Sequence, residues 1–204
     1  MDSITLHVPD AAAAKIFYDK AFGIGDQLNF RASDAPTSGF RGYVLSLVVP
    51  DPAVVDSLIV PALDAGATAI KPAKKSFWGY GGVVRTPDGA LWKVASSSKK
   101  AAGAPARQID DVVLLIGAAD VAESKRFYVD HGLTVAKSFG RKYVEFAGDG
   151  TDITLALYGR KAAAKDAGVN AAGSGSHRIE IGGDAGAFTD PDGFVWRASA
   201  DVAG

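Results

Sequence analysis

Alternating apolar and polar positions predict a strand near the beginning of the chain, followed by a helix. Residues 3–8 (SITLHV) place an apolar side chain at every second position, which is the period of a strand with one buried face. Asp10 is a good helix N-cap because its carboxylate accepts from free backbone N–H groups, and Gly23 suits the left-handed backbone that ends many helices. The pattern therefore predicts a helix between these two residues.

The same strand and helix pattern returns in the second half of the chain. The run 111–116 (DVVLLI) is an apolar strand, Asp120 is the next N-cap, and Gly132 ends the predicted helix. Each helix carries a Phe-Tyr pair at the same distance from its capping aspartate, at 17–18 and at 127–128. We interpret both pairs as core residues that fasten a helix to a sheet.

A second motif also occurs twice, later in each half. The stretches RTPDGALWKVAS (85–96) and TDPDGFVWRASA (189–200) both contain a Pro-Asp-Gly turn, two further residues, a Trp and a basic residue. Two unrelated motifs that recur in the same order indicate an internal duplication. We therefore predict a first domain at residues 1–98, a linker of small and polar residues at 99–108, and a second domain at 109–204.

The two halves differ in their remaining elements. In the first half a strand is predicted at 40–49 and a helix after Asp51, with Pro61 expected to kink or shorten this helix. In the second half residues 177–193 pass from strand to strand without a helix, while the Ala- and Gly-rich segment 159–176 predicts a short helix followed by a loop. The two halves therefore differ in which helices and strands of the shared pattern they contain.

The composition is ordinary for a globular protein and excludes several classes of function. The chain has 204 residues, of which 48% are hydrophobic and 22% charged, and its net charge is -1. This balance gives no attraction for nucleic acid or for an acidic membrane surface, and no apolar run is long enough to span a bilayer. Without cysteine there is no disulfide framework, thiolate metal site or cysteine nucleophile. The first residues lack a signal-peptide pattern, which predicts a cytoplasmic protein.

The strand, the Asp-capped helix with its Phe-Tyr pair and the late Pro-Asp-Gly turn together resemble the vicinal oxygen chelate superfamily. This superfamily includes glyoxalase I, extradiol dioxygenases, and fosfomycin- and bleomycin-resistance proteins. The resemblance covers nearly the whole chain and implies an α+β fold of tandem glyoxalase-like domains. In that fold, paired βαβββ units curl their strands into a cup that holds the ligand. Whether the protein is a monomer or a homodimer stays open.

The resemblance also implies where metal ligands would lie. In metal-dependent members they come from the first strand of each unit, usually as His, and from the last strand, usually as Glu four residues after the turn Gly. The matching positions in the first cup are Ser3, Val44 and Lys93. The matching positions in the second cup are Asp111, His177 and Arg197. A guanidinium does not coordinate a metal and repels one. The sequence therefore predicts metal-free sites and no cofactor.

Two interpretations of the basic residues are open at this point. In the first, Lys93 and Arg197 bind an anionic or carbonyl-bearing small molecule, and Arg offers a fork of donors. In the second, Arg197 pairs with Asp111 and fills a vacated metal site with an ion pair.

The segment KKSFWGYGG (74–82) supplies two further candidates. Trp78 and Tyr80 carry polar tips on a Gly-rich segment, which suits the wall of a small-molecule pocket. Packing on an edge strand is the alternative. The complete set of predicted ligand-binding residues is Lys93, Arg197, Asp111, His177, Trp78 and Tyr80.

Two functions of different classes are compatible with these residues. The one we favour is a metal-free protein that binds, and so sequesters or carries, a small anionic or aromatic molecule, as bleomycin-resistance proteins do. The alternative is a lyase, isomerase or dioxygenase with a metal held by Asp111 and His177 and by an additional ligand such as Glu145 or Glu180. A metal-free enzyme would instead use one of the two basic residues to stabilise an enolate. The lack of Glu on both last strands favours the binding protein.

Overall fold

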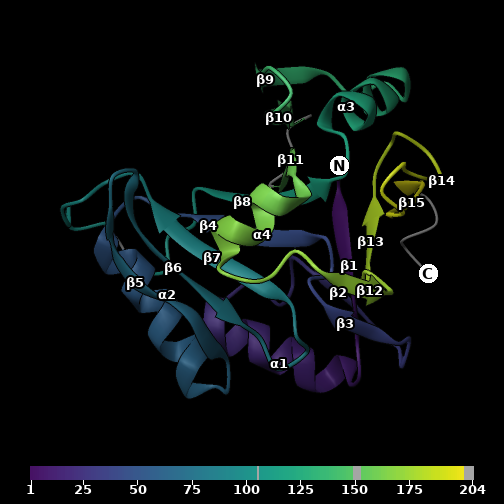
Figure 1. Cartoon of the computed structure of the whole chain (residues 1–204). Coiled ribbons are helices and arrows are strands. Elements are labelled where there is room, and N and C mark those ends of the chain that lie inside the picture. The colour runs from purple at the N-terminus through teal and green to yellow at the C-terminus, as the bar shows by residue number, and fades with distance from the viewer. Residues whose placement is uncertain (105, 149–152, 200–204) are drawn as a thin grey trace.

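The larger of the two main sheets has eight strands and runs through the middle of the molecule (Figure 1). The computed structural model describes residues 1–104, 106–148 and 153–199. The strand order of this sheet is β5 (Thr68–Ser76), β6 (Gly79–Arg85), β7 (Leu91–Ser96), β4 (Tyr43–Val48), β8 (Asp111–Ala118), β11 (Ile153–Gly159), β10 (Tyr143–Phe146) and β9 (Val135–Phe139).

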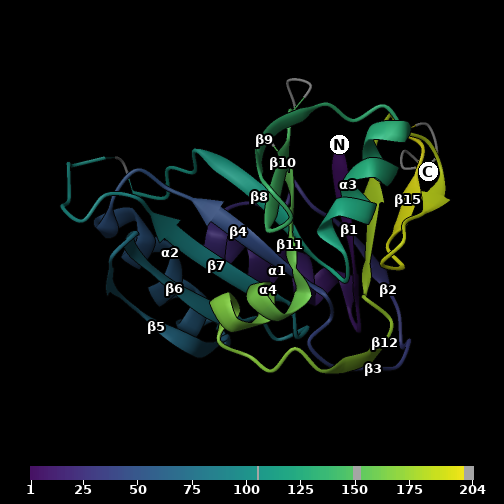
Figure 2. The same cartoon turned by 45° about the horizontal axis from the view of Figure 1, so that its top comes forward.

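This sheet consists of two βαβββ units joined side by side. In the first unit β4 pairs in parallel with β7, and α2 (Pro52–Asp64) connects β4 to β5. In the second unit β8 pairs in parallel with β11, and α3 (Val121–Asp130) connects β8 to β9. Strands β4 and β8 pair antiparallel and so join the two units. The arrangement confirms the predicted α+β fold of paired βαβββ units, and Figure 2 shows the curl of the sheet around α4.

The second sheet combines strands from the two ends of the chain. Its order is β14 (Phe188–Thr189), β15 (Val195–Arg197), β13 (Ile179–Gly182), β1 (Ser3–Val8) and β2 (Asn29–Ala32). Strand β1 pairs antiparallel with β13, and the short strands β3 (Thr37–Gly39) and β12 (Gly173–Gly175) form a separate ribbon. Each main sheet thus contains strands from both sides of segment 99–108. The division into domains at 1–98 and 109–204 stays a prediction.

The helix boundaries follow the predicted caps. Asp10 accepts from the backbone N–H of Ala13 at 2.9 Å at the start of α1 (Ala11–Phe22), and Gly23 ends this helix with a φ of 74°. Asp120 caps α3 in the same way. Pro61 lies inside α2, which continues to Asp64, so the helix does not stop at this proline. None of the described helices is long and apolar enough to cross a membrane.

Each Phe-Tyr pair connects its helix to the Trp strand that follows a Pro-Asp-Gly turn. In the first network, the indole Nε1 of Trp92 donates to the Tyr18 hydroxyl oxygen at 3.1 Å. The Tyr18 hydroxyl donates in turn to Asp88 of the turn at 2.8 Å. Phe17, Tyr18 and Tyr128 are buried and Phe127 packs partly buried against the core, which confirms the predicted core role of the Phe-Tyr pairs.

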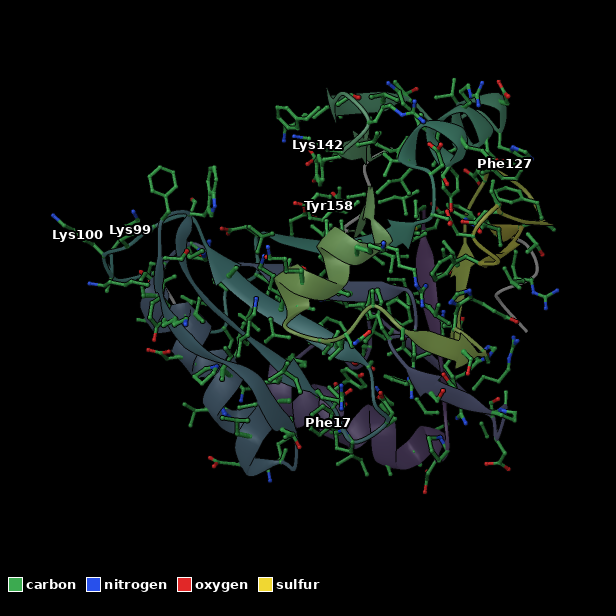
Figure 3. The ribbon with its side chains drawn as sticks, in the orientation of Figure 1. Phe17, Lys99, Lys100, Phe127, Lys142 and Tyr158 are labelled. Carbon is green, nitrogen blue, oxygen red and sulfur yellow. The ribbon has the colours of Figure 1, made fainter. Side chains whose placement is uncertain are left out.

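The second network repeats the first with different residues. Trp196 Nε1 donates to the Tyr128 hydroxyl oxygen at 3.3 Å, and the Tyr128 hydroxyl donates to the Asp190 carboxylate. Phe17 and Phe127, which precede the two tyrosines, lie at different ends of the molecule (Figure 3). The duplication inferred from sequence therefore corresponds to two copies of one Trp–Tyr–Asp hydrogen-bond network.

Helix α4 (Arg160–Ala167) lies on the side of the eight-stranded sheet that faces away from α2 (Figure 1). We call this side the inner face. Three alanines of α4 are completely buried or nearly so and pack in a small apolar cluster with sheet residues. The cluster consists of Ala163, Ala164, Ala167, Phe40, Val44, Val83 and Leu91. The short helix predicted within 159–176 is confirmed, and it covers part of the inner face.

Candidate functional site

The part of the inner face that α4 leaves open forms a groove. It has a volume of about 440 Å³ and runs along β5, β6 and β7 to Val48 on β4. Three lysines (Lys71, Lys74 and Lys93) line it, and its only carboxylate among the described lining residues is Asp166 of α4. The groove therefore carries a net positive charge.

Lys93 extends from β7 onto the inner face because its neighbours, Trp92 and Val94, occupy the core side of the strand. Its ammonium group forms an ion pair with the carboxylate of Asp166 at 2.7 Å. The two side chains are 34% and 42% exposed, so both are accessible from the groove. No acidic neighbour of Lys93 was evident along the sequence, and α4 supplies one.

Lys71 ties the end of α4 to β5. Its ammonium group donates to the backbone carbonyls of Lys165 and Asp166 at 3.1 and 2.5 Å. These carbonyls belong to the last turn of the helix, where a cation also suits the helix dipole. Lys71 therefore positions α4, and with it the carboxylate of Asp166, against the groove.

The two predicted aromatic residues have different surroundings. Trp78 lies in the turn between β5 and β6, lines the groove and is 83% exposed, with Phe77 beside it at a ring distance of 5.0 Å. Tyr80 also borders the groove, but its hydroxyl donates to Asp56 of α2 at 2.9 Å. The polar tip of Tyr80 is thus held towards α2, while Trp78 is available to a ligand.

Asp111 lies on the inner face of β8, opposite Val48 in the antiparallel pair of β4 and β8. Val48 lines the groove, so Asp111 lies next to the far end of the groove without lining it. The Thr154 hydroxyl donates to the Asp111 carboxylate at 3.1 Å. Burial raises the pKa of Asp111, and the nearby charge of Glu145 acts in the same direction.

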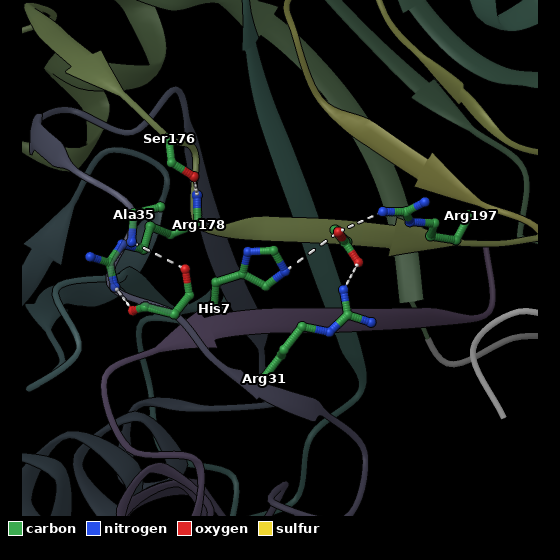
Figure 4. Close-up of polar contacts among 8 residues, drawn as sticks. His7, Arg31, Ala35, Ser176, Arg178 and Arg197 are labelled. Atoms are coloured by element: carbon green, nitrogen blue, oxygen red, sulfur yellow. Dashed lines mark hydrogen bonds and ion pairs between the residues drawn. The ribbon is translucent and has the colours of Figure 1, made fainter. Parts of the chain in front are cut away.

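Arg197 contacts a different carboxylate, on the five-stranded sheet. It donates to Glu180 of β13 at 3.2 Å, and Arg31 of β2 donates to the same carboxylate at 2.6 Å. The imidazole of His7 on β1 lies 3.6 Å from Glu180 (Figure 4). Asp111 belongs to the other sheet and has Thr154, Glu145 and Lys137 around it. The acidic partner found for Arg197 is therefore Glu180.

The charges around Glu180 determine its protonation. Burial acts to raise the pKa of Glu180, but the guanidinium groups of Arg197 and Arg31 outweigh it and hold this pKa below its ordinary value. Burial lowers the pKa of His7, against the opposing charge of Glu180. The two arginines therefore favour the ionised form of Glu180, while burial favours the neutral form of His7.

We expect the substitution Glu180→Gln to destabilise the protein near pH 7 and to have less effect in acid. A carboxylate with a lowered folded-state pKa contributes stability above its unfolded pKa, near 4.5, and loses it as the pH falls through the folded value. Urea unfolding of both proteins at about pH 7 and pH 3 measures the difference in the free energy of unfolding. Glu123→Gln on exposed α3 is the control. A difference that stays the same at both pH values would contradict this assignment.

His177 occupies a structural position just before β13. Its Nδ1 lies 2.5 Å from the backbone oxygen of Arg41, and its Nε2 lies 3.1 Å from that of Asp192. The ring stacks on Phe194 with a centroid distance of 4.0 Å. Both ring nitrogens are therefore engaged by the backbone. The structure brings Lys93 and Trp78 together in the groove with Asp111 at its border, while Arg197 and His177 lie elsewhere.

The comparisons with known proteins agree with this architecture. No family model and no curated protein sequence matches the chain. Among solved structures, glyoxalase I from Zea mays aligns over 99% of this chain and 93% of its own with a TM-score of 0.62 and 14% identity. A Bacillus subtilis protein named as a candidate dioxygenase aligns over 89% of this chain and 68% of its own, with a TM-score of 0.56 and 12% identity.

The chain has the vicinal oxygen chelate fold. Many proteins of this fold hold a divalent metal in the cup. Whether this chain could do so depends on the side chains at the corresponding places. Asp111, His177 and Arg197 come from separate places, and Arg197 is a cation. In the described part of the chain, no three His, Asp or Glu side chains gather in a way that could hold a metal ion. The donor set does not fit a metal of this fold.

Several residues of the site had no signal along the sequence. Asp166 and Lys71 reach the groove because α4 folds back over the inner face, a contact between distant parts of the chain. The sequence indicates Glu180 only as a metal ligand and gives no signal for Arg31. The alternation along β13 places Glu180 on the polar face of its strand, which was the one available indication.

Proposed function

We propose that this protein of vicinal oxygen chelate fold binds a small anionic molecule in the inner-face groove, without a metal. The observation that carries the proposal is the ion pair between Lys93 and Asp166 inside a groove with two further lysines. The carboxylate of Asp166 lies where the anionic group of a ligand would bind. Trp78, at the border of the groove, offers a face for an aromatic part of the ligand.

The small energy of the ion pair between Lys93 and Asp166 supports replacement of Asp166 by a ligand. An ion pair between partly exposed side chains contributes only about 0–1 kcal/mol to stability, because water screens it and both side chains lose conformational freedom. A ligand carboxylate can therefore replace Asp166 beside Lys93 at little cost. The described groove lining holds no histidine, and its one carboxylate is paired, which supports binding without acid–base chemistry.

Two substitutions that should change the affinity for anions in opposite directions test the proposal. Lys93→Met should weaken the binding of aromatic carboxylates such as benzoate at least about tenfold, the equivalent of about 1.4 kcal/mol. Asp166→Asn should strengthen it, because the internal competitor loses its charge. Binding is measured by thermal shift and calorimetry, with benzamide as the neutral ligand control and Lys161→Met, on the exposed side of α4, as the protein control.

A purely structural ion pair predicts a different outcome. Both substitutions would then lower thermal stability by a similar amount, and neither would change the response to benzoate. Elemental analysis of protein never exposed to chelator tests the metal-dependent enzyme. One equivalent of metal that is lost on His177→Ala or Asp111→Asn would overturn the proposal.

A further inference from the structure

Charged side chains of the inner face lie on several strands of the eight-stranded sheet. Three of its cationic side chains lie on β5 and β7, at Lys71, Lys74 and Lys93, and a fourth, Lys137 on β9, lies beside Glu145. Its acidic side chains lie on β8 and β10, at Asp111 and Glu145. The groove therefore lies in a positive region of the first βαβββ unit and ends at Val48, and the acidic Asp111 lies beyond that end on the second unit.

The strand register sets the distance between the two regions. Lys93 pairs with Ser46 of β4, and two residues further along, Ala95 pairs with Val48, which is opposite Asp111. Lys93 and Asp111 are therefore two strands and two residues apart. With strands about 4.8 Å apart and a rise of about 3.3 Å per residue, their Cα atoms are separated by about 12 Å.

The surface between the two charges is apolar on one side. The direct line crosses β4 between the polar Ser46 and the apolar Val48, and Val48 and Ala95 line the groove on one side of it. Val48 is 39% exposed, an unusual exposure for an apolar side chain in the middle of a sheet. Such a floor suits the methylene chain or ring of a ligand that spans the two charged ends.

The two acidic side chains differ in how their charge is balanced. Glu145 pairs with Lys137 at 2.7 Å, so its charge already has a partner. Asp111 has the neutral Thr154 hydroxyl as its hydrogen-bond donor, and among the described residues it forms no ion pair. The charge of Lys137 acts on Asp111 without an ion pair between them, so a cation that binds directly next to this half-buried carboxylate stabilises it further.

We infer that the groove binds a bipolar ligand, an extended amino acid whose carboxylate lies at Lys93 and whose ammonium group lies at Asp111. This inference rests on the proposed function and adds the second end of the ligand. Side chains from both ends shorten the span, so the charges of the ligand should be about 8–10 Å apart. That separation corresponds to ω-amino acids of about six to eight carbons.

A series of ω-amino acids from about four to twelve carbons, each with the alkanoic acid and the alkylamine of equal length, tests the inference by calorimetry. The best ω-amino acid should bind at least about tenfold more tightly than the matched acid, which corresponds to about 1.4 kcal/mol. Asp111→Asn should reduce it to the affinity of the acid and leave the acid unchanged. Asp110→Asn, the adjacent exposed residue, is the matched control, and a far-UV spectrum checks that each variant is folded.

The outcomes separate the two proposals. If acid and amino acid bind equally well to the wild type and Asp111→Asn changes neither, the bipolar ligand is wrong and the anion site at Lys93 stands. If no acid binds to the wild type or to Asp166→Asn, both proposals fail. Should Asp111→Asn not fold, Thr154→Val removes the hydroxyl donor from the same carboxylate, and it should change the affinity for the amino acid but not for the acid.

Discussion

The substitution Trp196→Ala is expected to lower the free energy of unfolding by about 3–5 kcal/mol, the usual cost of deleting a buried large aromatic side chain. Trp196 is 1% exposed, stacks on Phe188 at a ring distance of 5.2 Å and donates to the Tyr128 hydroxyl oxygen. Its removal leaves a cavity between α3 and the five-stranded sheet. Urea unfolding followed by circular dichroism measures the loss.

The other two tryptophans provide matched comparisons. Trp92 occupies the equivalent place in the first repeat and is completely buried, so Trp92→Ala should cost a similar amount. Trp78 is 83% exposed, and Trp78→Ala should change stability by less than about 0.5 kcal/mol. If Trp196→Ala lowers the free energy of unfolding by less than about 1 kcal/mol, the Trp196–Tyr128–Asp190 network does not stabilise the fold as expected.

Asp190→Ala is the second substitution for which we expect a large loss of stability. The Asp190 carboxylate accepts from the backbone N–H groups of Asp192 and Phe194 at 3.0 and 2.7 Å, and from the Tyr128 hydroxyl. Three donors would lose their acceptor in a buried place, at about 1–3 kcal/mol for each that stays unsatisfied. We expect a total loss of about 3 kcal/mol or more, measured by urea unfolding.

The amide variant Asp190→Asn distinguishes hydrogen bonding from charge. The amide oxygen still accepts from the turn, so the loss should be less than half of that for Asp190→Ala. Burial raises the pKa of Asp190, so its protonated form is favoured in the folded state and its contribution to stability rises as the pH falls through this pKa. The advantage of wild type over Asp190→Asn should therefore grow towards acid. An advantage that shrinks instead would contradict the raised pKa.

The helices and strands could be predicted because the interactions that form them are local. The cap at Asp10, the left-handed Gly23 and the alternation in residues 3–8 each depend on a few neighbouring residues, and each is found as predicted. The helix through Pro61 shows the limit of such reasoning. A proline removes one donor and strains the preceding turn, but α2 packs along the sheet and continues for three more residues.

The candidate site could be predicted only in part. Alternation along β7 correctly places Lys93 opposite Trp92, because side chains of a strand alternate between its two faces. Its partner Asp166 depends on where α4 docks, and the partner of Arg197 depends on the pairing of β13 with β15. The proposed pairing of Arg197 with Asp111 missed Glu180, because the two aligned positions belong to different sheets.

The sequence by itself determined the duplication, the capped helices and the basic residue that follows the Trp in each repeat. Each of these features depends on a short sequence motif, because its geometry is set by local backbone hydrogen bonds and by the two-residue period of a strand. Only the tertiary structure decided that β1 pairs with β13 and β4 with β8, and that α4 brings Asp166 to Lys93. Such contacts join residues far apart in the chain, and the packing of the whole core selects them.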